Sequence, residues 1–245
     1  MSTSSPHGYD TRSWNPVTGC SKVSAGCRSC WAEEYSRRMG WPWKVTLHPE
    51  RLDEPLKWRK PEVVSVAFMG DLWHEDVPNE FRMKVMVAAA CNPLHTFLFL
   101  TKRAKDMRDF FQGSVCPATW WPAENIYLGV SVEDQATADE RIPLLLETPA
   151  AHRWVSAEPL LGPVYLLAYT PAFRSINLLP GIDWLVVGGE SGPRHRSCDP
   201  AWIADIVAQC DAAGVPCYVK QASHRYPGRQ GDIADALWAR KAVPW

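Results

Sequence analysis

The chain has 245 residues, of which 46% are hydrophobic and 22% are charged, and its formal net charge is −1. This composition is typical of a globular protein with one large α/β domain or two small ones. The near-neutral charge excludes the large basic field of many nucleic-acid-binding proteins, although local basic patches are compatible with it.

The N-terminal residues, MSTSSPHGYD, are polar and lack the basic region and apolar stretch of a secretory signal. No apolar run has the length of a membrane span, so we expect no membrane partner. Eight cysteines without an export signal predict a protein of the reducing cytoplasm. In that compartment, metal-binding or catalytic cysteines are expected before disulfides.

Apolar runs alternate along the chain with segments of helical periodicity, which predicts strands and helices in turn. The predicted strands are residues 12–16, 63–69, 96–100, 126–130, 153–157, 183–187 and 215–219. The predicted helices are residues 79–91, 104–112, 135–147, a helix from the N-cap Asp199 to Gly214, and a short C-terminal helix from Asp232. Residues 162–182 are the least regular part and are predicted to form a loop.

A repeat of fully apolar strands and helices is typical of a parallel sheet covered by helices. Six or seven such units favour a complete or partial barrel over an open sheet, although periodicity alone does not decide between the two. We expect a disordered polar tail over residues 1–11, a single barrel domain over residues 12–230, and a capping helix or tail over residues 231–245.

Three cysteines near the start of the chain carry the most chemical information. Six residues separate Cys20 from Cys27, and two separate Cys27 from Cys30. Thiolates grouped so tightly usually hold a metal. Three protein ligands leave one corner of a metal site open for a substrate or cofactor. A 4Fe–4S cluster on these three thiolates, with its fourth iron free, would have that arrangement.

Two other interpretations of the cysteines compete with the cluster. A structural zinc site needs four ligands, and His48 or His74 could supply a distant fourth one. Alternatively, the cysteines are merely buried. That is less favoured because Ser, Lys, Gly and Arg surround them rather than apolar residues.

Polar residues follow almost every predicted strand. In parallel α/β folds the C-terminal ends of the strands form the active-site face, so we expect these residues to meet in one pocket. The two consecutive glycines after the strand 183–187 would also let the backbone approach a ligand closely. The residues of this strand-end set are Gly70, Asp71, Thr101, Lys102, Arg103, Ser131, Glu133, Asp134, Ser156, Glu158, Gly188, Gly189, Glu190, Lys220 and Gln221.

Several segments together resemble one protein family. The opening WNPVTGCSKVSAGCRSCWAEEYSRRM is followed by KVTLHPERLDEPLKWRKP, MGDLWHEDVP, FLTKR, LGVSVEDQATADERIPLLLETPA, RWVSAEPLLGPV, WLVVGGESGP and VKQ. These strings resemble a phage- and prophage-associated family of unknown function with a three-cysteine motif. That family in turn resembles radical S-adenosylmethionine (SAM) enzymes.

The resemblance implies a partial (β/α)6 barrel of the TIM type, with a 4Fe–4S cluster on Cys20, Cys27 and Cys30. It implies SAM as second cofactor, with Gly70 and Asp71 at its amino group. It also implies an electron donor of the flavodoxin or ferredoxin type. The other residues expected to bind SAM are Lys102, Ser131, Glu133, Glu158, Gly188, Gly189 and Glu190.

Among the other cysteines, Cys198 and Cys217 fall near the predicted strand ends, and either could donate a hydrogen atom to a product radical. For each, simple burial is the commoner fate of a free cysteine. Cys91 and Cys210 fall near apolar helix faces and are expected in the core.

Two functions of other classes also fit the sequence. A divalent-metal phosphodiesterase or nuclease would use carboxylates among the strand-end residues, and a zinc-bound nucleic-acid module would not be an enzyme. A nucleic-acid base is a candidate substrate of a radical enzyme, because cations gather near the expected pocket. Those cations could instead pair with the carboxylates. The carboxylates are Asp71, Glu133, Asp134, Glu158 and Glu190, and the cations are Lys102, Arg103, Arg194, Arg196, Lys220 and Arg225.

Overall fold

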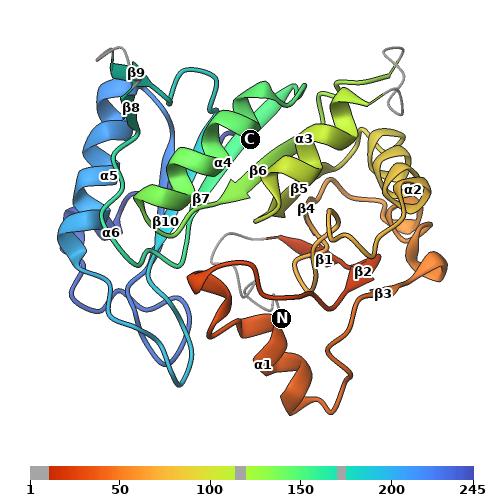
Figure 1. Ribbon diagram of the computed structural model, residues 1–245, viewed down its shortest axis with the longest axis horizontal. Helices are drawn as coiled ribbons and strands as arrows, with labels where there is room; N and C mark the ends of the chain where they lie inside the picture. The colour runs from red at the N-terminus through yellow and green to blue at the C-terminus, as the bar shows by residue number, and fades with distance from the viewer. Residues whose placement is uncertain (1–10, 114–119, 170–174) are drawn as a thin grey trace. The chain divides into compact units, whose positions relative to one another are not determined.

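The computed structural model (Figure 1) describes residues 11–113, 120–169 and 175–245. The predicted tail over residues 1–11 therefore lies outside the described part, apart from Thr11. Contacts between Cα atoms divide the chain into two compact units. The first, here the N-terminal unit, comprises the described residues up to 129 together with 147–152, and the C-terminal unit comprises residues 130–146 and the described residues from 153 onward.

The strands form a seven-stranded parallel sheet, and their order in it follows their order in the chain, β1-β4-β5-β6-β7-β10-β11. A doubly wound sheet reverses its strand order at a switch point, whereas a barrel does not. The predicted α/β fold of the partial-barrel type is therefore confirmed, with seven strands instead of six. The strands are β1 (Arg12–Trp14), β4 (Val63–Val66), β5 (Thr96–Thr101), β6 (Ile126–Ser131), β7 (His152–Ala157), β10 (Trp184–Gly188) and β11 (Cys217–Gln221).

The N-terminal unit pairs β1 with β4 and β4 with β5, both in parallel. Its core includes Trp14 of β1, whose ring meets Phe97 of β5 edge to face at 5.8 Å between centroids. The predicted helices are confirmed as α2 (Asn79–Ala90) and α3 (Ala104–Gln112). The described part of this unit also contains elements that were not predicted. They are α1 (Trp31–Arg38), the hairpin of β2 (Val17–Thr18) and β3 (Thr46–Leu47), and the short helices η1 (Ala25–Cys27), η2 (Pro49–Arg51) and η3 (Pro55–Lys57).

The C-terminal unit pairs β10 with both β7 and β11 in parallel. Helix α5 (Pro200–Ala213) begins as predicted, because the Asp199 carboxylate accepts a hydrogen bond from the Ala201 N–H. It ends at Gly214, whose φ is +70°. The other predicted helix of this part is confirmed as α4 (Gln135–Glu147).

One local prediction in the C-terminal unit was wrong, and the predicted short C-terminal helix is present with other bounds. The predicted loop 162–182 contains an antiparallel hairpin, β8 (Leu167–Tyr169) with β9 (Ser175–Asn177). The C-terminal helix α6 covers only Asp235–Trp238, and the residues after it bond to the sheet instead. There the Val219 N–H donates to the Arg240 carbonyl, and the Trp184 indole donates to the Ala242 carbonyl. None of the helices in the described ranges is long and apolar enough to cross a membrane.

Candidate functional site

All three clustered cysteines lie on the segment that joins β2 to α1, here the cysteine loop (residues 19–30). Its first residue, Gly19, forms a bridge with Gly70, and its N–H donates to the Met69 carbonyl at 2.8 Å. Cys27 ends η1, and Cys30 is the N-cap of α1. The loop is thereby anchored to the residues that follow β4.

Gly19 is required where the cysteine loop starts. Its φ is +78°, and a Cβ atom there would lie 2.0 Å from the Lys44 carbonyl oxygen. We therefore expect Gly19→Ala to lower the free energy of unfolding by more than the roughly 1–2 kcal/mol of a left-handed residue alone. Urea denaturation of the metal-free protein would measure the loss.

Gly40 supplies the matched control for this substitution. Its φ is +69°, but a Cβ atom there would meet nothing within 4 Å. Gly40→Ala carries the conformational cost without the clash, so it should be clearly milder. Equal losses in the two variants would contradict the clash at Gly19.

Arg103 connects the cysteine loop to the ends of β4 and β5. Its Nη1 donates to Cys20 Sγ at 3.3 Å and to Asp71 Oδ2 at 3.1 Å. Its Nη2 donates to the carbonyl and the hydroxyl of Ser21 at 3.2 and 2.8 Å. The Thr101 hydroxyl holds the other side of Asp71, with 2.8 Å to Oδ1. A thiol, a carboxylate and a guanidinium from three segments therefore meet in the N-terminal unit.

The electrostatic surroundings of the cysteines come from the same residues. Burial raises the pKa of Cys20 to about 11, and the negative charge of Asp71 adds to this, while Arg103 opposes it through its charge and its hydrogen bond. Burial also raises the pKa of Cys30, against backbone N–H groups of α1 and the charge of Lys102. The charge of Cys27 adds a smaller increase to the pKa of each of these two thiols.

The described residues contain no three His, Cys, Asp or Glu side chains that converge as a ready-made metal site. Both histidines considered as a fourth zinc ligand are also engaged. His48 Nε2 bonds the Thr18 hydroxyl at 2.8 Å, and its Nδ1 lies 3.1 Å from Glu50. His74 Nε2 bonds the Ser21 hydroxyl at 2.8 Å, and its Nδ1 accepts from the Asp76 N–H. Neither histidine is therefore placed as a ready fourth ligand beside the three thiols, which a four-ligand zinc site would require.

The strand-end carboxylates form separate ion pairs, each with its own cation. This arrangement does not resemble the convergent carboxylates of a two-metal hydrolase. Asp134 has a different task, because its carboxylate accepts from the Thr137 N–H at the start of α4. The pairs are Asp71 with Arg103 at 3.1 Å, Glu133 with Arg141 at 3.3 Å, Glu158 with Lys220 at 2.6 Å and Glu190 with Arg196 at 2.5 Å.

These pairs also change the interpretation of the predicted basic patch. Three of its six cations, Arg103, Arg196 and Lys220, neutralise carboxylates, as the alternative interpretation in the sequence analysis expected. These three are therefore not free to bind phosphate. Of the others, Arg225 lies over the ring of Tyr226 at 5.9 Å.

In the C-terminal unit, a second polar group forms around Glu158. Its carboxylate accepts from Lys220 at 2.6 Å and from Gln221 at 3.0 Å. The Gln221 amide also donates to the Gly189 carbonyl at 3.0 Å. A Cβ atom at Gly189 would lie 2.4 Å from the Ser223 nitrogen. Glycine is therefore needed here because the backbone after β11 passes close by, while the expected contact of these glycines with a ligand stays a prediction.

The remaining SAM-binding candidates are placed as follows. Ser131 is buried, and its carbonyl accepts from Arg141 at 2.7 Å. Gly188 also packs against β11, with a Cβ position 3.3 Å from the Gln221 carbonyl. Gly70 packs against the start of the cysteine loop, with a Cβ position 3.0 Å from the Gly19 carbonyl. Lys102 is half-buried and acts on the Cys30 thiol.

The two cysteines predicted as hydrogen donors differ in position. Cys198 lies in the segment between β10 and α5, and burial raises its pKa to about 12. Cys217 starts β11, so it lies at the opposite end of that strand from Lys220 and Gln221. It is fully buried, and its thiol group neighbours the free thiol group of Cys210 on α5. The expectation that Cys217 lies near the strand ends was therefore wrong, because the strand begins two residues later than predicted.

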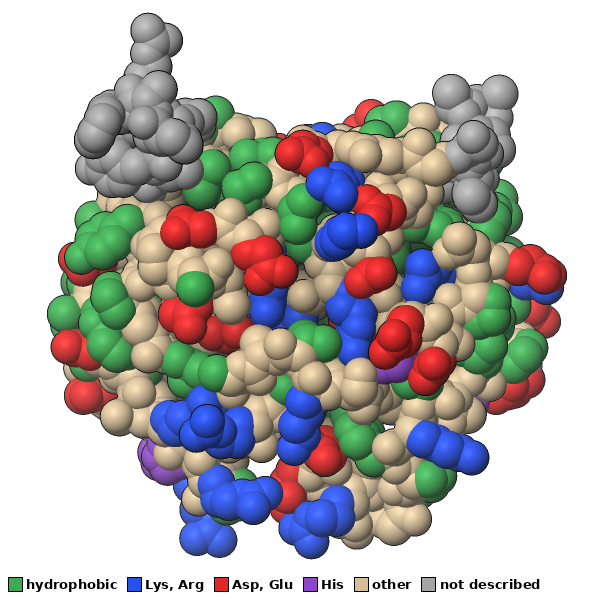
Figure 2. All heavy atoms as spheres, in the orientation of Figure 1, with side chains coloured by type: hydrophobic (Ala, Val, Ile, Leu, Met, Phe, Trp, Pro, Cys, Tyr) green, Lys and Arg blue, Asp and Glu red, His purple; other side chains and the backbone are tan. Residues whose placement is uncertain are grey.

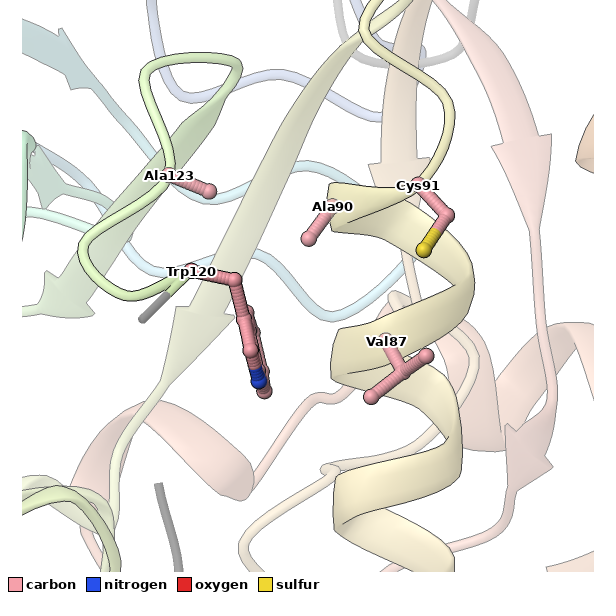
Figure 3. Close-up of a pocket in the computed structure, with 5 residues that line it drawn as sticks. All are labelled: Val87, Ala90, Cys91, Trp120 and Ala123. Carbon is pink, nitrogen blue, oxygen red and sulfur yellow. The ribbon is translucent and has the colours of Figure 1, made fainter. Parts of the chain in front are cut away.

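Cys91 corrects another prediction. It is exposed after the end of α2, whereas Cys210 is buried as expected. Cys91 lines an apolar pocket of about 220 Å³ opposite Trp120 (Figure 3). The residues that line this pocket are Val87, Ala90, Cys91, Trp120 and Ala123, and none of them is a candidate site residue.

Comparison with known proteins identifies the family. The family described as "Protein of unknown function (DUF5131)" matches residues 5–235. The chain belongs to this family. No curated protein matches it. A solved structure, "Spore photoproduct lyase complexed with dinucleoside spore photoproduct", is similar with a TM-score of 0.47 and 12% sequence identity. The similarity covers 91% of this chain but only 63% of that protein, and it is too low to indicate a function.

In this member of the family, Thr101 belongs to the site as expected from its place at a strand end, and its hydroxyl group bonds Asp71. Ser21 was not predicted as a partner of the site, yet its hydroxyl group bonds Arg103 and His74. Its position directly after a clustered cysteine was the available signal. The predicted association of the family with phages stays a prediction.

Proposed function

We propose that this protein is a radical SAM enzyme whose cluster is held by Cys20, Cys27 and Cys30. The observation that carries the proposal is the placement of the three thiols on one loop, which Arg103 ties through Cys20 and Ser21 to the ends of β4 and β5. The two nearby histidines are engaged elsewhere, so the loop offers three ligands and leaves the fourth corner open. When bound, a reduced 4Fe–4S cluster supplies the electron that cleaves SAM into methionine and a 5′-deoxyadenosyl radical able to abstract hydrogen from a substrate.

Each group of residues has its own role in the proposed function. Cys20, Cys27 and Cys30 provide the thiolates. Arg103 donates to the Cys20 sulfur and so places a positive charge beside a ligand that becomes negative on binding iron. Asp71 holds Arg103 in position. The groups proposed to contact SAM are Gly70, Asp71, Lys102, Ser131, Glu133, Glu158, Gly188, Gly189 and Glu190, and Cys198 remains the proposed hydrogen donor.

The partners follow from this function. A flavodoxin- or ferredoxin-type donor would reduce the cluster, and the reducing cytoplasm is the compartment in which three free thiols persist. The substrate class that we propose is a nucleic-acid base, for modification or repair.

Anaerobic purification tests the proposal most directly. Protein that is reconstituted with iron and sulfide should be brown and carry about four irons and four sulfides per chain. With dithionite and SAM it should release 5′-deoxyadenosine. A protein that binds one zinc tightly and takes up no iron would overturn the proposal. So would a reduced, cluster-loaded protein that neither binds nor cleaves SAM.

A further inference from the structure

Helix α1 has an unusual distribution of large and small side chains. Its buried positions are the small residues Ala32 and Ser36, four residues apart. Trp31 and Tyr35 lie on the exposed side, with 40% and 38% of their surface accessible. A helix that only stabilises a fold buries its large apolar side chains and exposes its small ones. The reversed arrangement marks this side of α1 as a surface for a partner.

The aromatic side chains beside the C-terminal end of α1 are held in a fixed arrangement. Gly40 adopts a φ of +69°, its N–H donates to the Arg37 carbonyl, and the Trp41 N–H donates to the Ser36 carbonyl. These two bonds form a Schellman motif. Trp41 thereby meets Tyr35 edge to face at 5.8 Å, yet 52% of its surface stays exposed. Rings that are positioned before binding lose little conformational freedom when a partner stacks on them.

The charge around these rings is strongly positive. Residues 20–44 contain five cations and two carboxylates, a net charge of +3 in a chain whose total is −1. Both carboxylates are already paired, Glu33 with Lys22 and Glu34 with Arg37. The guanidinium of Arg38 lies over the Tyr35 ring at 5.7 Å. Figure 2 shows Lys and Arg side chains over α1 and the loop that follows it. The remaining cations are Arg28, Arg38 and Lys44, all exposed.

We infer that this surface binds single-stranded nucleic acid. We call it the α1 face and define it by the rings Trp31, Tyr35 and Trp41, the side chain of Met39, and the cations Arg28, Arg38 and Lys44. Unpaired bases stack on exposed rings, and cations between the rings contact the phosphates. The inference rests on the proposed function, and it names the single-stranded form of the substrate and the surface that holds it.

The position of the α1 face supports this occupant. Cys30, the last of the clustered cysteines, is the N-cap of α1, and Trp31 is its first helical residue. A single-stranded nucleic acid bound along α1 would therefore run beside the cysteine loop. A second copy of the chain is disfavoured as the partner of the α1 face, because a symmetric contact would bring two surfaces of +3 charge together. A membrane surface is disfavoured as well, because Arg38 interrupts the apolar stripe between Tyr35 and Met39.

Fluorescence anisotropy with a labelled oligo-dT of about 20 nucleotides tests the inference. We expect binding that weakens about ten- to twentyfold between about 50 and about 200 mM NaCl, the dependence of roughly three phosphate contacts on a single strand. A duplex of the same length should bind more weakly, since its bases are not free to stack. Tyr35→Ala/Trp41→Ala should weaken oligo-dT binding at least about tenfold, the equivalent of one lost stacking contact.

Tyr165→Ala is the matched control, because Tyr165 is 55% exposed and lies outside the α1 face. It should bind oligo-dT as the unsubstituted protein does. Arg38→Glu/Lys44→Glu is a second variant of the face and should reduce both the affinity and its salt dependence. Far-UV circular dichroism of each variant shows whether α1 and the fold are retained.

Some results would overturn the inference. One is the absence of oligo-dT binding at low salt, and another is binding that Tyr35→Ala/Trp41→Ala leaves unchanged. A third is that the protein dimerises, or binds anionic phosphatidylserine vesicles, and that the same substitutions abolish this association. Measuring the affinity with and without reconstituted iron separates this inference from the proposed function. Iron-free protein that binds oligo-dT through the α1 face but never takes up a cluster would support the inference and contradict the proposed enzymatic function. Cluster-loaded protein that cleaves SAM but does not bind oligo-dT would do the reverse.

Discussion

Replacement of Cys20, Cys27 or Cys30 by alanine is expected to reduce the iron content of the reconstituted protein from about four atoms per chain to near zero. His48 and His74, the two histidines that bond the cysteine loop or its neighbouring strand, are both engaged at their two ring nitrogens, so we expect neither to replace a lost thiolate. Two thiolates that remain on a surface loop do not retain a cluster. Iron and sulfide analysis with a visible absorption spectrum of each anaerobically reconstituted variant measures the effect.

Cys91 and Cys210 provide the controls for the cluster prediction. Cys91 is exposed, so Cys91→Ala tests an accessible thiol outside the cysteine loop. Cys210 is buried on α5, so Cys210→Ala tests whether general destabilisation lowers the iron content. Both variants should bind as much iron as the original protein. Full iron content in Cys27→Ala, or an equal loss in Cys91→Ala, would contradict the assignment of the ligands.

Local sequence signals were sufficient to place most of the fold. The apolar strands and the helices between them appear within a few residues of their predicted bounds, because each is encoded by its own periodicity. Asp199 and Gly214 defined both ends of α5, because a cap acts on the adjacent turn of the helix. The spacing of the three cysteines likewise identified the cysteine loop before any geometry was known.

Features that depend on distant segments could not be predicted in this way. The sequence showed five strand-end carboxylates, but which of them pairs with a cation, and with which one, depends on the packing of the chain. Glu158, for example, pairs with Lys220, which is 62 residues away. The close approach of Ser223 to Gly189, 34 residues earlier in the chain, could not be predicted from the sequence either. Helix α1 was missed because it buries Ala32 and Ser36 instead of a large apolar stripe.

Asp71→Asn is expected to lower the free energy of unfolding by roughly 3–5 kcal/mol, the usual cost of removing one partner of a buried ion pair. The side chains of Asp71 and Arg103 are only 6% and 8% exposed, so the substitution leaves a charged guanidinium buried without its carboxylate. Arg103→Met removes that charge, so the double variant should be more stable than Asp71→Asn alone. Urea denaturation under anaerobic, reducing conditions measures all four proteins. Asp109→Asn is the control, because it weakens only the surface pairs of Asp109 with Lys105 and Arg108 and should change little.

The same variants show whether Asp71 affects SAM binding directly or through Arg103. Its two oxygens already accept from Arg103, Thr101 and the Trp73 N–H, so we expect most of its influence to pass through Arg103. Asp71→Asn and Arg103→Met should then weaken SAM binding to a similar extent in the cluster-loaded protein, measured by equilibrium dialysis. If Asp71 holds the SAM amino group directly, only Asp71→Asn loses that charge-assisted contact, worth roughly 1.5–3 kcal/mol or about tenfold or more in Kd. Equal iron content in the two variants is required for the comparison, because a lost cluster would abolish SAM binding in either case.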